Sequence, residues 1–439
     1  MSNHLGKAIH RAIRLQHSDV YEKFLQAQQT GGRRGVPVQL PLHQARAFVR
    51  QARAKRSSFA ILYLDLTEAF YRILREVPIG GIITDDFLGY LMARLKLPPD
   101  SLHTLHELLD EPPALQQAGR SEMDRRCMQA IHTSTFFWLD GQSDISRTRI
   151  GTRPGDCMAD LIFGFAWACV LKKLEAYMLE QGALASFPHC DHLPLFGQFA
   201  HEGVGLYFAG PEILTRHVGD IGGHLLVLCE YHGMQPNLGH GKTELMLTFR
   251  GASSRKARVQ FYGPTAGRHF PIVREKCTSQ IQVVSRYRHL GGVLHHTGDQ
   301  AVEIRQRAAI ARAAMNQHKK VLFCNPYIDL RKRAELFQML VMSMFLYGAD
   351  TWVAMDDRTM HKFSATVLMF DMMIMYLNRK SWSGWHSPVH LSFFIEYDFG
   401  TLLRWFTRRF RRFGRSLQNK PWFGCGSNYE LLHRFRPHE

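Results

Sequence analysis

The feature that most constrains the fold is the short apolar run from Phe59 to Leu64, which ends at the carboxylate of Asp65. Runs of four to eight apolar residues rich in β-compatible side chains are typical of buried strands. Most of the surrounding sequence instead has the 3.6-residue apolar period of amphipathic helices. The run therefore predicts a short strand with the carboxylate of Asp65 at its end.

The other elements follow from the same periodicities and from glycine and proline breakers. A helix that is apolar on nearly every side is expected after the loop Gly151–Asp156, and such a helix must be mostly buried. After residue 298 the pattern changes to long helices, so we expect a domain boundary there. Helices are predicted at 5–28, 41–55, 157–179, 212–231 and 401–415, two more between 84 and 109, and hairpin strands at 136–139 with 148–150 and at 193–199 with 205–209.

The composition favours a polyanionic partner. The 439 residues include 55 Lys and Arg against 38 Asp and Glu, and the net charge of +17 attracts nucleic acid or an anionic membrane. Hydrophobic residues make up 45% of the chain, enough apolar surface to exclude wholesale disorder.

Cysteine usage and apolar run lengths bear on the compartment. The eight cysteines are scattered without a CxxC pair, which argues against a disulfide framework or a zinc ribbon and favours a reducing, intracellular compartment. The longest apolar runs, Leu161–Leu171 and Met339–Tyr347, have about half of the roughly 20 residues that span a bilayer, so no membrane partner is expected. The basic segment His4–Arg14 is also compatible with a transit peptide, and nucleus and cytoplasm are not distinguished.

The segment from Leu62 to Phe70 contains the first candidate site. A carboxylate on a rigid strand suits magnesium, a hard cation that takes oxygen ligands and keeps several waters for substrate phosphates. The simpler interpretation is a solvated acid, or a cap of the following helix. Taken alone, a strand-end acid such as Asp65 is more often of this simpler kind.

Further motifs occur along the chain with Asp65 and Phe70. They are Gly31–Gly35, Gly151–Asp156, His232–Asn237 with Gly241–Glu244, Tyr287–Gly292 and Leu346–Trp352. In this order they resemble the motifs of reverse transcriptases of non-LTR (LINE-type) retrotransposons, over about residues 5–380. The resemblance implies a right-hand fold with an α/β palm, helical fingers and an all-helical thumb.

The resemblance also implies a role for each matching residue. Asp65 would bind a catalytic metal, and Phe70 would be the aromatic gate that excludes a ribose 2'-hydroxyl. The remaining roles are support of template and nucleotide by Arg153, Pro154 and Gly155, a triphosphate contact by Lys242, and a primer grip at Leu290 and Gly291. Magnesium is the implied cofactor, with manganese possible, and an RNA template and a DNA primer are the implied partners.

The same resemblance divides the chain into regions. Partial fingers would cover residues 1–58, a palm 59–298 with a finger insertion at about 76–135, a helical thumb 299–380, and a basic helical extension 381–439. Intact family members usually carry an endonuclease domain before this region, and this chain shows none. We therefore expect a degenerate or fragmentary copy.

The chain departs from the family at the second metal ligand. The family has an adjacent pair of aspartates at a hairpin tip, where this chain has His201 and Glu202. Two-metal phosphoryl transfer needs at least two or three carboxylates, and imidazole is a poor ligand for magnesium. Glu202 would bind the metal with Asp65, and we expect polymerisation to be weak or absent. The alternative is a non-catalytic nucleic-acid-binding relic of a retrotransposon.

Several basic elements fit phosphate contacts, which supply affinity without sequence information. Each of them alone is more often a solvated face. The elements are Arg33-Arg34, Arg53–Arg56, Arg305–Arg307, Lys319-Lys320 and Arg408–Arg412.

Overall fold

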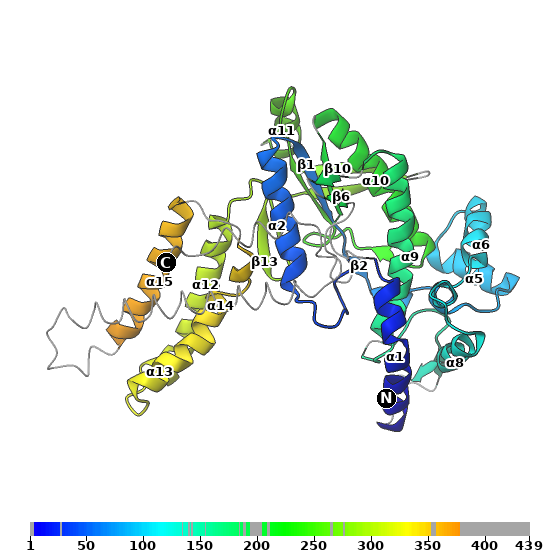
Figure 1. Cartoon of the computed structure of the whole chain (residues 1–439), viewed down its shortest axis with the longest axis horizontal. Coiled ribbons are helices and arrows are strands. Elements are labelled where there is room, and N and C mark those ends of the chain that lie inside the picture. The colour runs from blue at the N-terminus through cyan, green and yellow to red at the C-terminus, as the bar shows by residue number, and fades with distance from the viewer. Residues whose placement is uncertain are drawn as a thin grey trace. The chain divides into compact units, whose positions relative to one another are not determined.

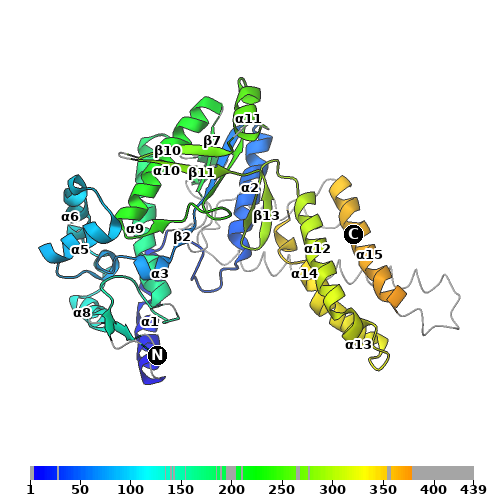
Figure 2. The same cartoon turned by 180° about the vertical axis from the view of Figure 1, so that it is seen from behind.

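The chain divides into two units, each described by itself. Unit 1 comprises Met1–Arg34 and Lys55–Val284, and unit 2 comprises Gly35–Ala54 and Ser285–Glu439. The fold is mixed α/β, mainly helical with a small mixed sheet (Figure 1, Figure 2). The computed structural model describes residues 4–26, 29–133, 135–138, 141, 144–153, 155–183, 185–187, 190–193, 204–208, 211–263, 267–274, 277–352 and 357–377.

Unit 1 contains a five-stranded sheet in which β1 (Ser58–Tyr63) is an interior strand (Figure 1). All six residues of β1 are buried, which confirms the strand predicted from its apolar sequence. β1 pairs antiparallel with β7 and β9, whereas β11 pairs in parallel with β9. The strand order is β10 (His269–Val273), β11 (Thr278–Val283), β9 (Glu244–Thr248), β1 and β7 (Val204–Phe208).

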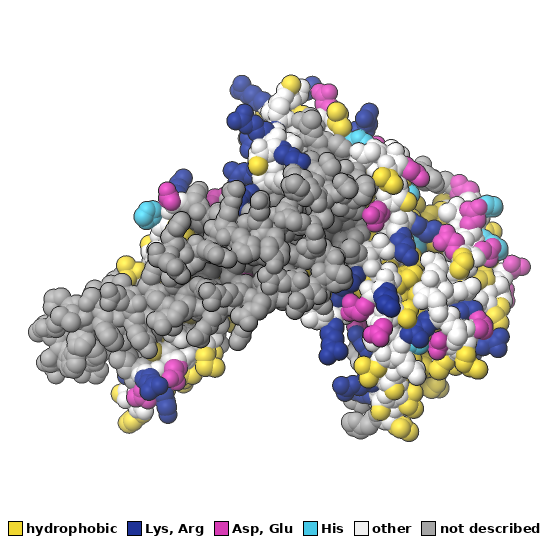
Figure 3. Space-filling model, in the orientation of Figure 1, with side chains coloured by type: hydrophobic (Ala, Val, Ile, Leu, Met, Phe, Trp, Pro, Cys, Tyr) yellow, Lys and Arg dark blue, Asp and Glu magenta, His cyan; other side chains and the backbone are white. Residues whose placement is uncertain are grey.

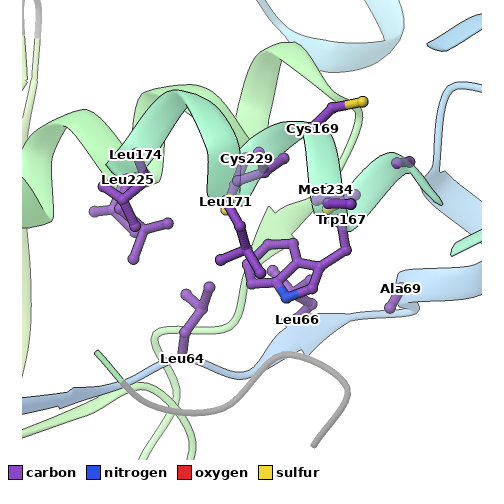
Figure 4. Packing of buried hydrophobic residues seen from close by; sticks show 14 of the residues in the cluster. Leu64, Leu66, Ala69, Trp167, Cys169, Leu171, Leu174, Leu225, Cys229 and Met234 are labelled. Carbon is purple, nitrogen blue, oxygen red and sulfur yellow. The ribbon is translucent and has the colours of Figure 1, made fainter. Parts of the chain in front are cut away.

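The helices α9 (Ala159–Glu180) and α10 (Pro211–Tyr231) supply much of the apolar core of unit 1. α9 is buried along nearly all of its first half, as its uniformly apolar sequence predicts. Figure 4 shows side chains of both helices in one apolar cluster, among them Leu171 and Leu174 of α9 and Leu225 and Cys229 of α10. The two helices therefore pack against each other, and α10 also packs against β1, β7 and β10 of the sheet.

The helix α1 (His4–Phe24) packs along α9, and polar side chains contribute to the contact. Arg14 donates hydrogen bonds to both carboxylate oxygens of Asp160, and His10 Nδ1 lies 2.8 Å from Asp156 Oδ2. Asp160 in the first turn of α9 and Asp156 just before it therefore help to position the N-terminal helix.

Short helices occupy the chain between β1 and α9, and both views show α5, α6 and α8 beside α9 (Figure 1, Figure 2). The two helices predicted between residues 84 and 109 are confirmed as α5 and α6. The helices are α3 (Ala69–Arg72), α4 (Glu76–Ile79), α5 (Asp85–Leu95), η1 (Pro99–Ser101), α6 (Leu102–Asp110), α7 (Ala114–Gln117) and α8 (Glu122–His132).

The predicted hairpins are confirmed in part. β3 (Phe136–Trp138) pairs with β4 (Ile145–Arg147), so the strand predicted at 148–150 begins three residues too late, because Phe136 pairs with Arg147. β7 pairs with β1, and β6 (Cys190–Leu193) pairs with β5 (Ala185–Phe187). Residues 194–203, which include most of the other predicted strand, lie outside the described residues. Unit 1 also contains β2 (Leu66–Thr67), β8 (Gln235–Pro236) and α11 (Ser254–Tyr262).

Unit 2 has its own apolar core, in which Phe323, Phe337, Phe345 and Phe370 are buried together. The long helices predicted after residue 298 are confirmed, although residues 401–415 lie outside the described chain. Its elements are α2 (Gln39–Ala54), β12 (Arg286–His289), β13 (Gly292–His295), α12 (Ala301–His318), η2 (Lys319–Phe323), α13 (Leu330–Phe337), η3 (Gln338–Met342), α14 (Ser343–Phe345), η4 (Ala349–Thr351) and α15 (Asp357–Leu377). Among the described helices of the chain, none is both long and apolar enough to cross a membrane.

The contact of Tyr21 with Gly164 gives a test of how α1 docks on α9. A Cβ at position 164 would overlap the buried Tyr21 ring. We expect Gly164→Ala to lower the free energy of unfolding by about 1–3 kcal/mol, the usual cost of overpacking. Gly89→Ala in α5 is the matched control, since nothing lies within 4 Å of its Cβ, and it should stabilise by roughly 0.5–1 kcal/mol. Urea unfolding of both variants measures the difference, and equal effects would contradict the docking.

Candidate active site

Asp65 follows β1 directly, and its backbone is held on both sides by the loop that precedes β9. Its N–H donates to Thr243 Oγ1 at 3.1 Å, and the same hydroxyl lies 3.2 Å from Asp65 O. The N–H of Asn237 also donates to Asp65 O at 2.8 Å. Thr243 is fully buried, so water does not compete for these bonds. The position of Asp65 is thus fixed by more than its strand.

The carboxylate of Asp65 faces an amide and an amine. Asn237 Nδ2 donates to Asp65 Oδ2 at 3.1 Å, and Lys242 Nζ lies 3.7 Å from the same oxygen. The side chain of Asp65 is 26% exposed and that of Lys242 is 51% exposed. Two of the predicted site residues, Asp65 and Lys242, are therefore in contact and accessible to solvent.

The glycine loop predicted to support template and nucleotide is bound to the segment after Asp65. The N–H of Gly151 donates to Ile73 O at 2.8 Å, and the N–H of Thr152 donates to Phe70 O. Gly151 has φ +79°, and a Cβ there would overlap the backbone of Tyr71. Only glycine permits this approach of two backbone segments.

Phe70, the predicted aromatic gate, is half-buried, and its ring centroid lies 5.3 Å from that of Phe163 on α9. Arg153 and Gly155 are exposed in the loop. Pro154 lies outside the described residues. The described part of the loop is therefore hydrogen-bonded to the segment that follows Asp65 and contains Phe70.

The predicted second metal ligand, Glu202, and its neighbour His201 lie outside the described residues. The described ranges contain no group of three or more His, Cys, Asp or Glu side chains that could hold a metal ion. Asp65 is an oxygen donor of the kind that magnesium prefers. A metal at this position requires further ligands besides it.

Unit 2 contains the turn predicted as a primer grip, between β12 and β13. Leu290 has φ +47° and Gly291 has φ +81°, the left-handed conformations of a two-residue hairpin turn. Tyr347 Oη donates to Leu290 O at 3.2 Å, and the Arg307 guanidinium donates to Gly291 O. The Arg307 guanidinium also lies over the Tyr347 ring, 4.5 Å from its centroid. The motif Leu346–Trp352 therefore supports, through Tyr347, the turn of the motif Tyr287–Gly292, which lies about 60 residues earlier in the sequence.

A buried charge network next to this turn was not predicted from the sequence. Glu303 is 1% exposed and receives hydrogen bonds from Arg46 of α2 and Arg307 of α12. Arg46 also donates to Thr351 Oγ1. Burial lowers the pKa of Arg46 to about 9, so the guanidinium still carries its charge at neutral pH. The spacing of Glu303 and Arg307, four residues apart on a predicted helix, was the available signal.

Two of the predicted phosphate contacts are wrong. The guanidinium of Arg33 donates to the carbonyls of Leu25 and Gln26 at 3.0 and 2.7 Å, where it satisfies the end of α1. The guanidinium of Arg307 belongs to the buried network described above. Both side chains are less than 10% exposed, because each satisfies buried acceptors of the fold.

Comparisons with known proteins give one structural likeness to report. No family model matches the chain, and no curated protein matches it. Among solved structures, it is similar to the telomerase from Candida albicans, determined in complex with a TWJ fragment of telomeric RNA. The identity is 10% and the TM-score 0.34, and the match covers 88% of this chain. The chain spans 56% of the length of that telomerase chain.

The hydrogen bonds between the Thr243 hydroxyl and the backbone of Asp65 can be tested by replacing Thr243. Replacement by valine removes the hydroxyl and leaves the buried N–H of Asp65 without its acceptor. We expect Thr243→Val to lower the free energy of unfolding by about 1–3 kcal/mol, and Thr243→Ser, which keeps the hydroxyl, to cost less. Denaturant unfolding of both variants checks this, and equal losses would show that the hydroxyl is not what stabilises the site.

The network of unit 2 can be tested through Glu303. Glu303→Gln leaves two buried guanidinium groups without a countercharge, a change that typically costs about 3–5 kcal/mol. Glu335→Gln is the matched control, because Glu335 pairs with Arg331 at 3.5 Å on the surface and such pairs contribute about 0–1 kcal/mol. In thermal unfolding, Glu303→Gln should lower the melting temperature much more than Glu335→Gln does. Similar melting temperatures of the two variants would refute the role of Glu303.

Proposed function

We propose that this chain is an impaired RNA-directed DNA polymerase, related to the reverse transcriptases of non-LTR retrotransposons. Its reaction would be the transfer of a nucleotide to a primer 3'-hydroxyl on an RNA template. The proposal is supported most directly by the Asp65 carboxylate, which is fixed at the end of an interior strand with Lys242 Nζ 3.7 Å away. Such catalysis consists mostly of positioning and charge stabilisation.

The described residues support a metal-binding role for Asp65 through their chemistry. Its carboxylate is partly exposed, and its backbone is held by Thr243 and Asn237, as a preorganised ligand requires. Magnesium held by Asp65 and Glu202 would offset the charge on the transferred phosphoryl group. Lys242 Nζ, which lies near Asp65 Oδ2, would contact the anionic triphosphate.

The proposal that Glu202 completes the site is supported by chain connectivity. Val204 pairs with Leu62 of β1, three residues before Asp65. Glu202 precedes Val204 by two residues, and two residues span at most about 7 Å. The substitution of the family's aspartates by His201 and Glu202 is the reason to expect impaired activity.

A second candidate function is binding of nucleic acid without chemistry. The net charge of +17 favours it, and it requires no second metal ligand. The two candidates predict different effects of restoring the aspartate pair.

The experiment is extension of an oligo(dT) primer on a poly(A) template, with magnesium and with manganese. The variant His201→Asp/Glu202→Asp should extend at least about 100-fold faster than the unmodified chain, since one metal ligand contributes several kcal/mol and about 1.4 kcal/mol is tenfold in rate. Adding Asp65→Asn to this variant should abolish extension. Adding Asp85→Asn, an exposed acid of α5, should not.

Each other outcome has a definite meaning. Extension by the unmodified chain at the rate of the restored variant would make Glu202 a working ligand and refute the impairment. If the restored variant is folded, as its melting temperature shows, and does not extend, the polymerase proposal is refuted and binding remains.

A further inference from the structure

A basic surface lies at the end of the sheet of unit 1 opposite to Asp65. We call it the α11 surface, and it consists of Arg56, Arg250, Arg255, Lys256 and Arg258, all of which are exposed. Figure 3 shows Lys and Arg side chains gathered where α11 lies in Figure 1. Arg56 belongs to one of the predicted phosphate-contact elements, whereas none of the predicted catalytic, nucleotide-binding or primer-grip residues belongs to this surface.

The strand pairing separates this surface from the candidate active site. Arg250 N–H donates to Ser58 Oγ at 2.9 Å, so Arg250 and Arg56 flank the start of β1. Asp65 lies beyond the other end of the same strand, seven residues from Ser58. At about 3.3 Å per residue this is roughly 23 Å. A nucleic acid must therefore extend over roughly this length to contact both Asp65 and the α11 surface.

The positive charge of the α11 surface is not offset by its neighbours in sequence. No Asp or Glu occurs between residues 245 and 274, or between residues 23 and 64. Within the described residues, none of its five side chains forms an ion pair. One acid, Glu212, follows β7 near the start of β1, and it offsets a single charge. The local field therefore attracts anions.

The helix α11 presents its charges rigidly. Phe261 is buried and stacks on Phe249 and Phe270, with ring centroids 5.6 and 5.7 Å apart. Arg258 donates to Phe249 O at 3.1 Å, which ties the helix to the end of β9. Arg255 and Lys256 consequently lie on a helix that is held in place, so binding of a ligand there does not require a loop to become ordered.

The same packing argues for nucleic acid rather than a membrane as the partner. Ala257 and Phe261 of α11 are buried in the protein core, and Val259 is the exposed apolar residue of this nine-residue helix. Helices that lie in a membrane interface need a broad apolar face to insert. Exposed arginines and a lysine without such a face are suited to phosphates in water.

We infer that the α11 surface binds the phosphate backbone of a nucleic acid, independently of sequence and separately from the Asp65 site. The inference goes beyond the proposed function, because it holds whether or not the chain polymerises nucleotides. It gives the chain a second point of attachment to an RNA or DNA strand.

The test is the salt dependence of binding of a fluorescein-labelled single-stranded RNA of mixed sequence to the full chain, measured by anisotropy in EDTA. EDTA removes any metal-dependent contribution at Asp65. Arg255→Gln/Lys256→Gln should reduce the slope of log K against log salt by about 1.4, two contacts at about 0.7 each, and weaken binding about 25-fold at 0.1 M salt.

The chain offers a matched control in Arg331→Gln/Lys332→Gln. This pair also follows the first residue of a helix, α13, and both side chains are exposed, so its removal changes the charge equally. We expect little change in its slope. An equal loss in both variants, or no loss in the α11 variant, would overturn the inference. So would an α11 variant that binds RNA normally but loses binding to vesicles of anionic phospholipid, since the partner would then be a membrane.

Discussion

The architecture of unit 1 depends on the burial of β1 between β7 and β9. An interior strand exposes no free edge, and each of its residues is covered, so the chain after it begins at a defined point. The position of Asp65 is then set by the strand and by the Thr243 hydroxyl, which hydrogen-bonds to both the N–H and the carbonyl oxygen of Asp65. The glycine loop at 151 and the loop at 237–243 are attached to the same segment. A carboxylate held in this way needs little reorganisation to act as a ligand.

Unit 2 depends on a different kind of constraint, a carboxylate enclosed by two guanidinium groups. Glu303 links α2 to α12 through Arg46 and Arg307, and Arg307 continues to the turn at Leu290 and Gly291. A network of this type contributes less to stability than its charges suggest, because burial of each charge is costly. It joins α12, the hairpin turn and Tyr347 through the Arg307 guanidinium.

The sequence was sufficient for features that depend on local patterns. The apolar run before Asp65 identified β1, and the uniformly apolar helix after residue 157 identified the core helix α9, because burial on all sides leaves a clear composition signal. The contact of Lys242 with Asp65 was not predicted, since it joins residues 177 positions apart that only folding brings together. Arg33 and Arg307 were misassigned because exposure of a basic side chain is not visible in sequence. The resemblance to reverse transcriptases supplied roles for residues, and all of these roles remain predictions. Pro154, His201 and Glu202 also lie outside the described residues.

The arrangement of unit 2 has a consequence for how the chain is made. α2 is synthesised early, yet the acid that neutralises Arg46 is 257 residues further along the chain. At about 5–20 residues per second, the ribosome needs roughly 13–50 s to reach Glu303. Throughout that interval Leu40, Leu42 and Phe48, which are almost completely buried in the finished fold, belong to a helix whose later neighbour η4 has not yet been made. The nascent chain must therefore keep this helix soluble, alone or with a chaperone, until that later segment has emerged.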